Sequence, residues 1–90
     1  MTAPNYAEAG PWPVLAQGWD DRSIWGWDPV ERSFYAQLWR NGEAGDAPHV
    51  ALGTVFRPVR EQAELARQIS AVTKTPLHEV DQMMAESQRM

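Results

Sequence analysis

The fold is decided by the stretch Trp25-Gly-Trp-Asp-Pro-Val-Glu-Arg-Ser-Phe-Tyr-Ala-Gln-Leu-Trp-Arg40, which holds three of the five tryptophans of the chain. Its second half alternates between two kinds of side chain, as a half-buried strand does. One set is apolar and suits a protein core, and it consists of Phe34, Ala36 and Leu38. The other set would point to the opposite face, and it consists of Tyr35, Gln37 and Trp39. The pattern therefore predicts a strand over residues 33–40 with one core face and one aromatic face.

Two further strand signals precede this one. Residues 24–27 are expected to form a strand in which Trp25 and Trp27 share a face, and Asp28-Pro29 suits a tight turn after it. Residues 14–19 show a weaker pattern, interrupted by a glycine, for a short first strand.

The chain that follows suggests a partner strand. A polar loop over residues 41–48 is too long for a two-residue hairpin and leads to a second alternating run, residues 49–56. The apolar face of that run consists of Val50, Leu52, Thr54 and Phe56. The two runs are therefore predicted to pair in antiparallel fashion.

The chain after Pro58 is expected to form two helices. An apolar stripe at helical spacing follows this proline, formed by Val59, Ala63, Leu65, Ala66, Ile69 and Val72. Thr75-Pro76 then begins a second helix, whose narrower stripe contains Leu77, Val80 and Met84. This order of elements predicts an α+β fold, in which two C-terminal helices pack on one face of a small antiparallel sheet of three or four strands.

The domain is expected to span residues 14–90, preceded by an extended arm over residues 1–13. The arm contains several prolines and little periodic pattern, so Tyr6 and Trp12 are its only large anchors. Trp12 is expected either to pin the arm to the domain edge or to reach a neighbouring subunit.

Composition narrows the function classes. The chain has 90 residues, a net charge of −4 and a pI near 5.0, which fits one domain and argues against a nucleic-acid partner. There is no cysteine, so the sequence offers neither a disulfide nor a thiolate metal site. No apolar run approaches the roughly 20 residues of a membrane span, and the first residues do not resemble a signal peptide. A cytoplasmic protein without a cofactor is expected.

Motifs for catalysis or metal binding are weak. His49 and His78 are far apart in the sequence and have no further ligands at a recognisable spacing, so no metal site is expected. A sugar site is an open alternative, built from tryptophans next to carboxylates: Trp19, Trp25 and Trp27 with Asp20, Asp21, Asp28 and Glu31. A glycosidase would need two carboxylates across a cleft, for which so small a domain has little room, and we expect no enzyme.

The helix pair is a second open alternative, as a nucleic-acid-associated regulator. Basic residues near the first helix favour it: Arg57, Arg60, Arg67 and Lys74. The second helix argues against it, because Glu79, Asp81 and Glu86 would repel phosphates.

The leading hypothesis is a protein-interaction module. Five tryptophans would require about 1,000 Å² of cover, more than one sheet face and two helices are expected to provide. The surface predicted to bind a partner protein, or a second copy of the chain, consists of Trp25, Trp27, Tyr35, Gln37 and Trp39. The alternative is that the N-terminal arm covers this surface.

Overall fold

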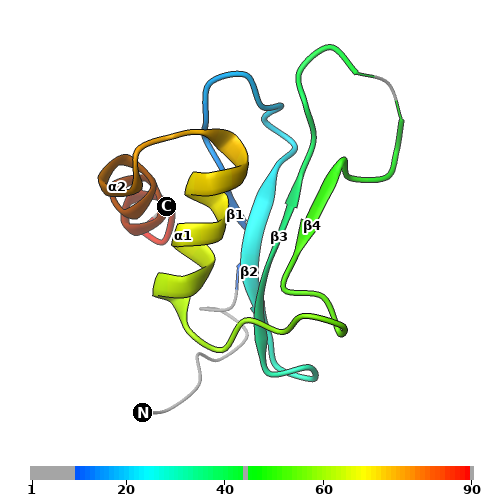
Figure 1. Ribbon diagram of the computed structural model, residues 1–90, viewed down its shortest axis with the longest axis vertical. Coiled ribbons are helices and arrows are strands. Elements are labelled where there is room, and N and C mark those ends of the chain that lie inside the picture. The colour runs from blue at the N-terminus through cyan, green and yellow to red at the C-terminus, as the bar shows by residue number, and fades with distance from the viewer. Residues whose placement is uncertain (1–9, 44, 90) are drawn as a thin grey trace.

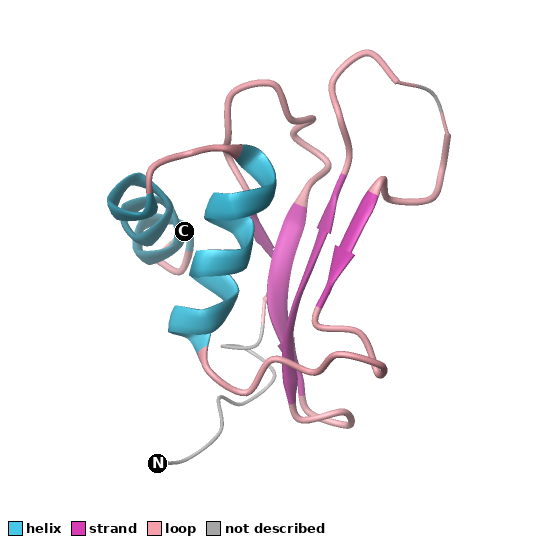
Figure 2. Ribbon diagram, viewed as in Figure 1, coloured by secondary structure: helices cyan, strands magenta, loops and turns pink. Residues whose placement is uncertain are grey.

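The computed structural model describes residues 10–43 and 45–89 as a four-stranded antiparallel sheet covered on one face by two helices. The strands lie side by side in chain order, and both helices lie on the same side of the sheet (Figures 1 and 2). The elements are β1 (Trp12–Pro13), β2 (Ile24–Asp28), β3 (Ser33–Leu38), β4 (Val50–Leu52), α1 (Gln62–Thr73) and α2 (Leu77–Ser87). The predicted α+β class, with C-terminal helices on an antiparallel sheet, is confirmed.

The central hairpin joins β2 and β3. Asp28 organises its turn, because its Oδ1 accepts the backbone N–H groups of Val30 (2.9 Å) and Glu31 (3.2 Å). This is the local bonding that makes aspartate favourable before a turn. The register places Trp25 opposite Ala36 and Trp27 opposite Phe34. Directly paired residues in antiparallel strands share a face, so both tryptophans lie on the face that carries Phe34 and Ala36.

That face is the core. Its fully buried members from the sheet and the helices include Trp25, Leu38, Leu65, Ile69, Val80 and Met84. Trp25 is 0% exposed and its ring lies 4.5 Å from that of Trp12, centroid to centroid. Its indole N–H donates to the buried hydroxyl of Ser87 at 3.1 Å, which joins the sheet to the end of α2. The hydrogen bond satisfies the one polar atom that this large side chain brings into the core.

The first strand differs from the expectation. Residues 14–19 do not form a strand; the sheet begins instead with Trp12–Pro13, within the segment expected to be an arm. Trp12 pairs with Trp25 across the strands, and this contact fixes the edge of the sheet. The chain then turns at Gly18, which has a φ of 87°, before Trp19 forms an isolated bridge with Arg40.

The fourth strand is interrupted. β4 pairs Leu52 with Ala36, so a continued strand would place Thr54 opposite Phe34, yet Val59 occupies that position. Residues 54–58 therefore leave the sheet as a loop, which we call the edge loop, and Val59 returns to bond with Phe34. The predicted strand over residues 49–56 is thus shorter than expected.

Both helices begin later than predicted. α1 starts at Gln62 instead of Pro58, because Val59 bonds with β3 and the Arg60 side chain donates to backbone carbonyls of the hairpin turn. α2 starts at Leu77, with Pro76 as its N-cap. Neither helix is long and apolar enough to cross a membrane, as judged over the described residues.

Candidate interaction surface

Two of the residues predicted to lie on the binding surface lie instead on the core side of the sheet. Trp25 is fully buried in the core, and Trp27 is half-buried on the same side, packed edge-on against Phe34 with 4.8 Å between ring centroids. The prediction that Trp25 lies on the exposed face is therefore wrong. The sequence pattern identified two faces in β3 correctly, but the register assigns both tryptophans of β2 to the inner one.

Trp39 is held by contacts within the chain. It follows the end of β3, where its Nε1 donates to the Asp46 carbonyl at 3.2 Å and the Arg22 guanidinium lies 5.2 Å from the ring centroid. Trp19 is covered in the same way by Arg40, at 5.3 Å. These cation–π contacts add cover to both tryptophans, and Trp19 also packs against the edge of the core.

The uncovered face of the sheet has a different composition. Register places Ile24, Tyr35, Gln37 and Ala51 on the side away from the helices, and we call this the open face. A shallow hollow of about 410 Å³ lies on it. Its lining includes these four residues together with Asp28, Glu31, Thr54 and Val55. Tyr35 and Gln37 are thus the two predicted site residues that the structure brings together on a surface.

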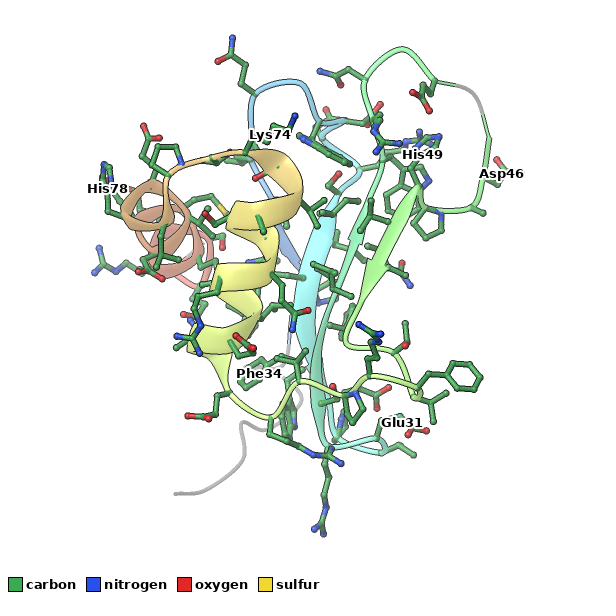
Figure 3. All side chains as sticks on the ribbon, in the orientation of Figure 1. Glu31, Phe34, Asp46, His49, Lys74 and His78 are labelled. Atoms are coloured by element: carbon green, nitrogen blue, oxygen red, sulfur yellow. The ribbon has the colours of Figure 1, made fainter. Side chains whose placement is uncertain are left out.

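Three exposed apolar residues lie at the hairpin end of the sheet, and we call them the apolar rim. They are Val30 in the β2–β3 turn and Val55 and Phe56 in the edge loop, and their side chains are 84%, 63% and 90% exposed. Val55 lines the hollow, whereas Val30 and Phe56 are chain neighbours of lining residues. Figure 3 shows Glu31 at this end of the sheet, next to the loop that leads toward α1. Phe56 was expected on the core face with Val50 and Leu52, which is wrong because the strand ends before it. The alternating pattern could not reveal where pairing stops.

The electrostatics of the open face are acidic. Asp28 and Glu31 line the hollow, and neither forms an ion pair with any described residue. Partial burial raises the pKa of the Tyr35 phenol, and the negative charge of Asp28 raises it further. Both effects disfavour a phenolate, so Tyr35 is a neutral hydroxyl and a hydrogen-bond donor at neutral pH.

The residues of the sugar alternative are not brought together. Trp19 and Asp20 lie beside the Arg40 end of the sheet, whereas Asp28 and Glu31 lie at the hairpin end, where β3 begins. Asp20 serves its own turn: its Oδ1 accepts the backbone N–H of Arg22 at 2.9 Å, and this bond lowers the pKa of the carboxyl. Trp25, the tryptophan between these two ends, is buried in the core, so the expected set does not form one site.

The histidines have separate positions. Figure 3 shows His49 beside the long loop after β3 and His78 on α2, on opposite sides of the molecule. His49 Nδ1 accepts the Arg40 backbone N–H at 3.0 Å, and Nε2 lies 3.1 Å from a Glu43 carboxylate oxygen. Among residues 10–43 and 45–89, no three His, Asp or Glu side chains come together as metal ligands.

Trp12 is half-buried in β1 against the core, and Tyr6 lies outside the described residues. The exposed side of α2 carries His78, Glu79, Asp81 and Glu86.

No family model matches the sequence, and no curated protein or solved structure is significantly similar to it.

Proposed function

We propose that the chain is a non-enzymatic interaction module that binds another protein through the open face and the apolar rim. The observation that carries this proposal is the exposure of Val30, Val55 and Phe56 beside a sheet face that no helix covers. Single exposed apolar residues are ordinary on proteins, but a group of them around a hollow is typical of a binding surface.

Phe56 is the strongest anchor in this group. Burying a phenylalanine side chain contributes about 1.5–3 kcal/mol, and nine-tenths of this one is still exposed. The edge loop that carries it is tied down at both ends: Gly53 fits against the backbone of β3, and Val59 bonds to Phe34 and Ser33. A fixed loop loses little conformational entropy on binding, which favours affinity.

A cytoplasmic location is part of the proposal. The lack of cysteine in the sequence is compatible with a reducing compartment. The nucleic-acid alternative has less support, because the exposed side of α2 carries carboxylates that phosphates would repel.

The test is capture by photo-crosslinking in the native host with the tagged full chain. A photoreactive amino acid at Gln37, on the open face, should link to a protein of defined mass. The variant Phe56→Ser should abolish that product while leaving the fold intact. Leu77→Ser is the matched control, because Leu77 is an exposed apolar residue (40%) on α2 and its change should leave the product unaltered.

Two results would count against the module. Equal crosslinking in the parent and Phe56→Ser would show that the rim does not bind the captured protein. Loss of the product in both Phe56→Ser and Leu77→Ser would show that any polar substitution on the surface abolishes crosslinking, so that the effect is not specific to the apolar rim.

A further inference from the structure

We infer that the hollow on the open face receives a basic side chain, arginine or lysine, from the partner protein, next to an apolar partner residue that contacts Phe56. This inference rests on the proposed function and adds the chemistry of the partner. It follows from three features of the hollow: its unpaired carboxylates, its aromatic wall and its lack of cations.

The carboxylates are available to a ligand. Both hydrogen bonds that Asp28 accepts from the turn use Oδ1, so its second oxygen has no partner among the described residues. The exposed Glu31 side chain accepts no hydrogen bond and forms no ion pair in the same part of the chain. Because both residues line the same hollow, a guanidinium or ammonium group within it would be attracted to both carboxylates.

The wall of the hollow suits the stem of such a side chain. Ile24, Tyr35 and Ala51 form an apolar and aromatic surface beside the carboxylates. Long basic side chains lie along apolar surface while their charged ends reach a polar group, and a tyrosine ring face attracts cations. The ring of the half-buried Tyr35 can therefore contact both the apolar stem and the charged end of the basic side chain.

The lack of cations argues against a second copy as the occupant. No Lys, Arg or His is among the described residues that line the hollow. A two-fold contact through this face would bring the same surface together twice and oppose carboxylates with carboxylates. Like charges in a desolvated interface are unfavourable, so a basic partner of a different sequence fits better.

The test uses the full ¹⁵N-labelled chain and two matched peptides, acetyl-Leu-Arg-Leu-amide and acetyl-Leu-Gln-Leu-amide. The arginine peptide should shift the backbone amide signals of Tyr35, Gln37 and Ala51 at millimolar concentration. It should bind about tenfold more tightly than the glutamine peptide at low salt, as expected for two partly exposed charge pairs. Added salt should reduce this ratio, because it screens the pairs.

A charge-removal variant locates the effect. Asp28→Asn with Glu31→Gln keeps the side-chain oxygen that organises the turn and should reduce the ratio between the peptides to about one, on the same charge-pair scale. Glu79→Gln with Asp81→Asn changes the net charge equally on the exposed side of α2 and should leave the ratio unchanged.

The outcomes separate the two proposals. Shifts at the open face with equal affinity for both peptides would overturn the basic-partner inference and leave the interaction module standing. A dimer that buries the open face, detected by sedimentation and abolished by Phe56→Ser, would likewise overturn it in favour of a second copy. If neither peptide shifts the open face and Phe56→Ser leaves the crosslinked product unchanged, both proposals fail.

Discussion

Gly53 should be the least replaceable glycine in the described chain. It directly follows β4 and has a φ of 68°, and a Cβ atom built on it would lie 1.8 Å from the Phe34 carbonyl oxygen and 2.9 Å from the Tyr35 Cα. Both contacts are with backbone, so no side chain can rotate away. The variant Gly53→Ala must move either β3 or the edge loop.

The cost has two parts. A left-handed φ costs a residue with a Cβ about 1–2 kcal/mol. Moving the backbone also strains the bonds around Ser33, whose hydroxyl accepts the Val59 N–H at 2.7 Å and lies 3.4 Å from the Gly53 carbonyl; losing a buried bond of this kind costs about 1–3 kcal/mol. Together they predict a loss of about 2–5 kcal/mol, a large part of the stability of a domain of this size.

Urea unfolding followed by tryptophan fluorescence measures this loss as a lower midpoint at constant slope. Gly42→Ala is the matched control: Gly42 also has a positive φ (77°), but nothing lies within 4 Å of the added Cβ. The control should lose only the conformational part, about 1–2 kcal/mol. If the two variants were equally stable, the close approach of Gly53 to β3 would be refuted.

Three further outcomes are expected. Ser87→Ala should cost about 1–3 kcal/mol by leaving the Trp25 indole N–H unsatisfied in the core, and the penalty should shrink when Trp25→Phe is added, as a double-mutant cycle in urea would show. Phe56→Ser should change the free energy of unfolding by less than about 0.5 kcal/mol, because the side chain is exposed; a larger loss in the same assay would mean that it packs within the fold. The Asp20 carboxyl has a lowered pKa in the folded state, mainly through the Arg22 backbone N–H, so its contribution to stability is present above its unfolded pKa and is lost as the pH falls through the folded value. Asp20→Asn should therefore flatten the acid limb of a stability–pH profile, and an unchanged limb would contradict the assignment.

The sequence predicted the architecture because its signals are local and periodic. The alternation in residues 33–38 identified both faces of β3, and the helical stripe identified Leu65, Ala66 and Ile69 as core residues. A Pro-containing turn and a polar loop then separated the strands in the observed order. Such patterns identify the residues that become buried, and these residues form the core.

The candidate surface was only half predictable, because register is not a local property. Tyr35 and Gln37 lie on the open face as expected, but alternation within β2 does not reveal which face its tryptophans share with β3. The tryptophans also have more cover than their areas suggested. Trp12 and Trp25 pack against each other with tilted rings, and Trp19 and Trp39 are partly covered by arginines, so less of the helix surface is needed.

The residue at which β4 stops pairing with β3 could not be predicted from the sequence either. Phe56 continues the apolar alternation of Val50 and Leu52, and nothing in that run marks where the strand stops. The cause lies elsewhere in the chain. Val59 bonds to Phe34 and to the Ser33 hydroxyl, so Val59 occupies the position next to β3 and the preceding loop cannot pair with it. A contact that spans more than 20 residues decides the position of this aromatic residue.

The bonds that exclude the edge loop from the sheet also hold it in one position, which suits the proposed role in binding. If β4 continued, Thr54 would take the place beside Phe34 and the Ser33 hydroxyl would lose its partner at Val59. Val59, which precedes α1, is itself a core residue, 2% exposed, so its burial holds the end of the loop from the other side. The same burial that stabilises the helix on the inner face of the sheet thus fixes Phe56 at the rim of the outer face. Phe56 is consequently exposed because of how the core is arranged, and we propose that it, and not the buried Trp25, contacts the partner.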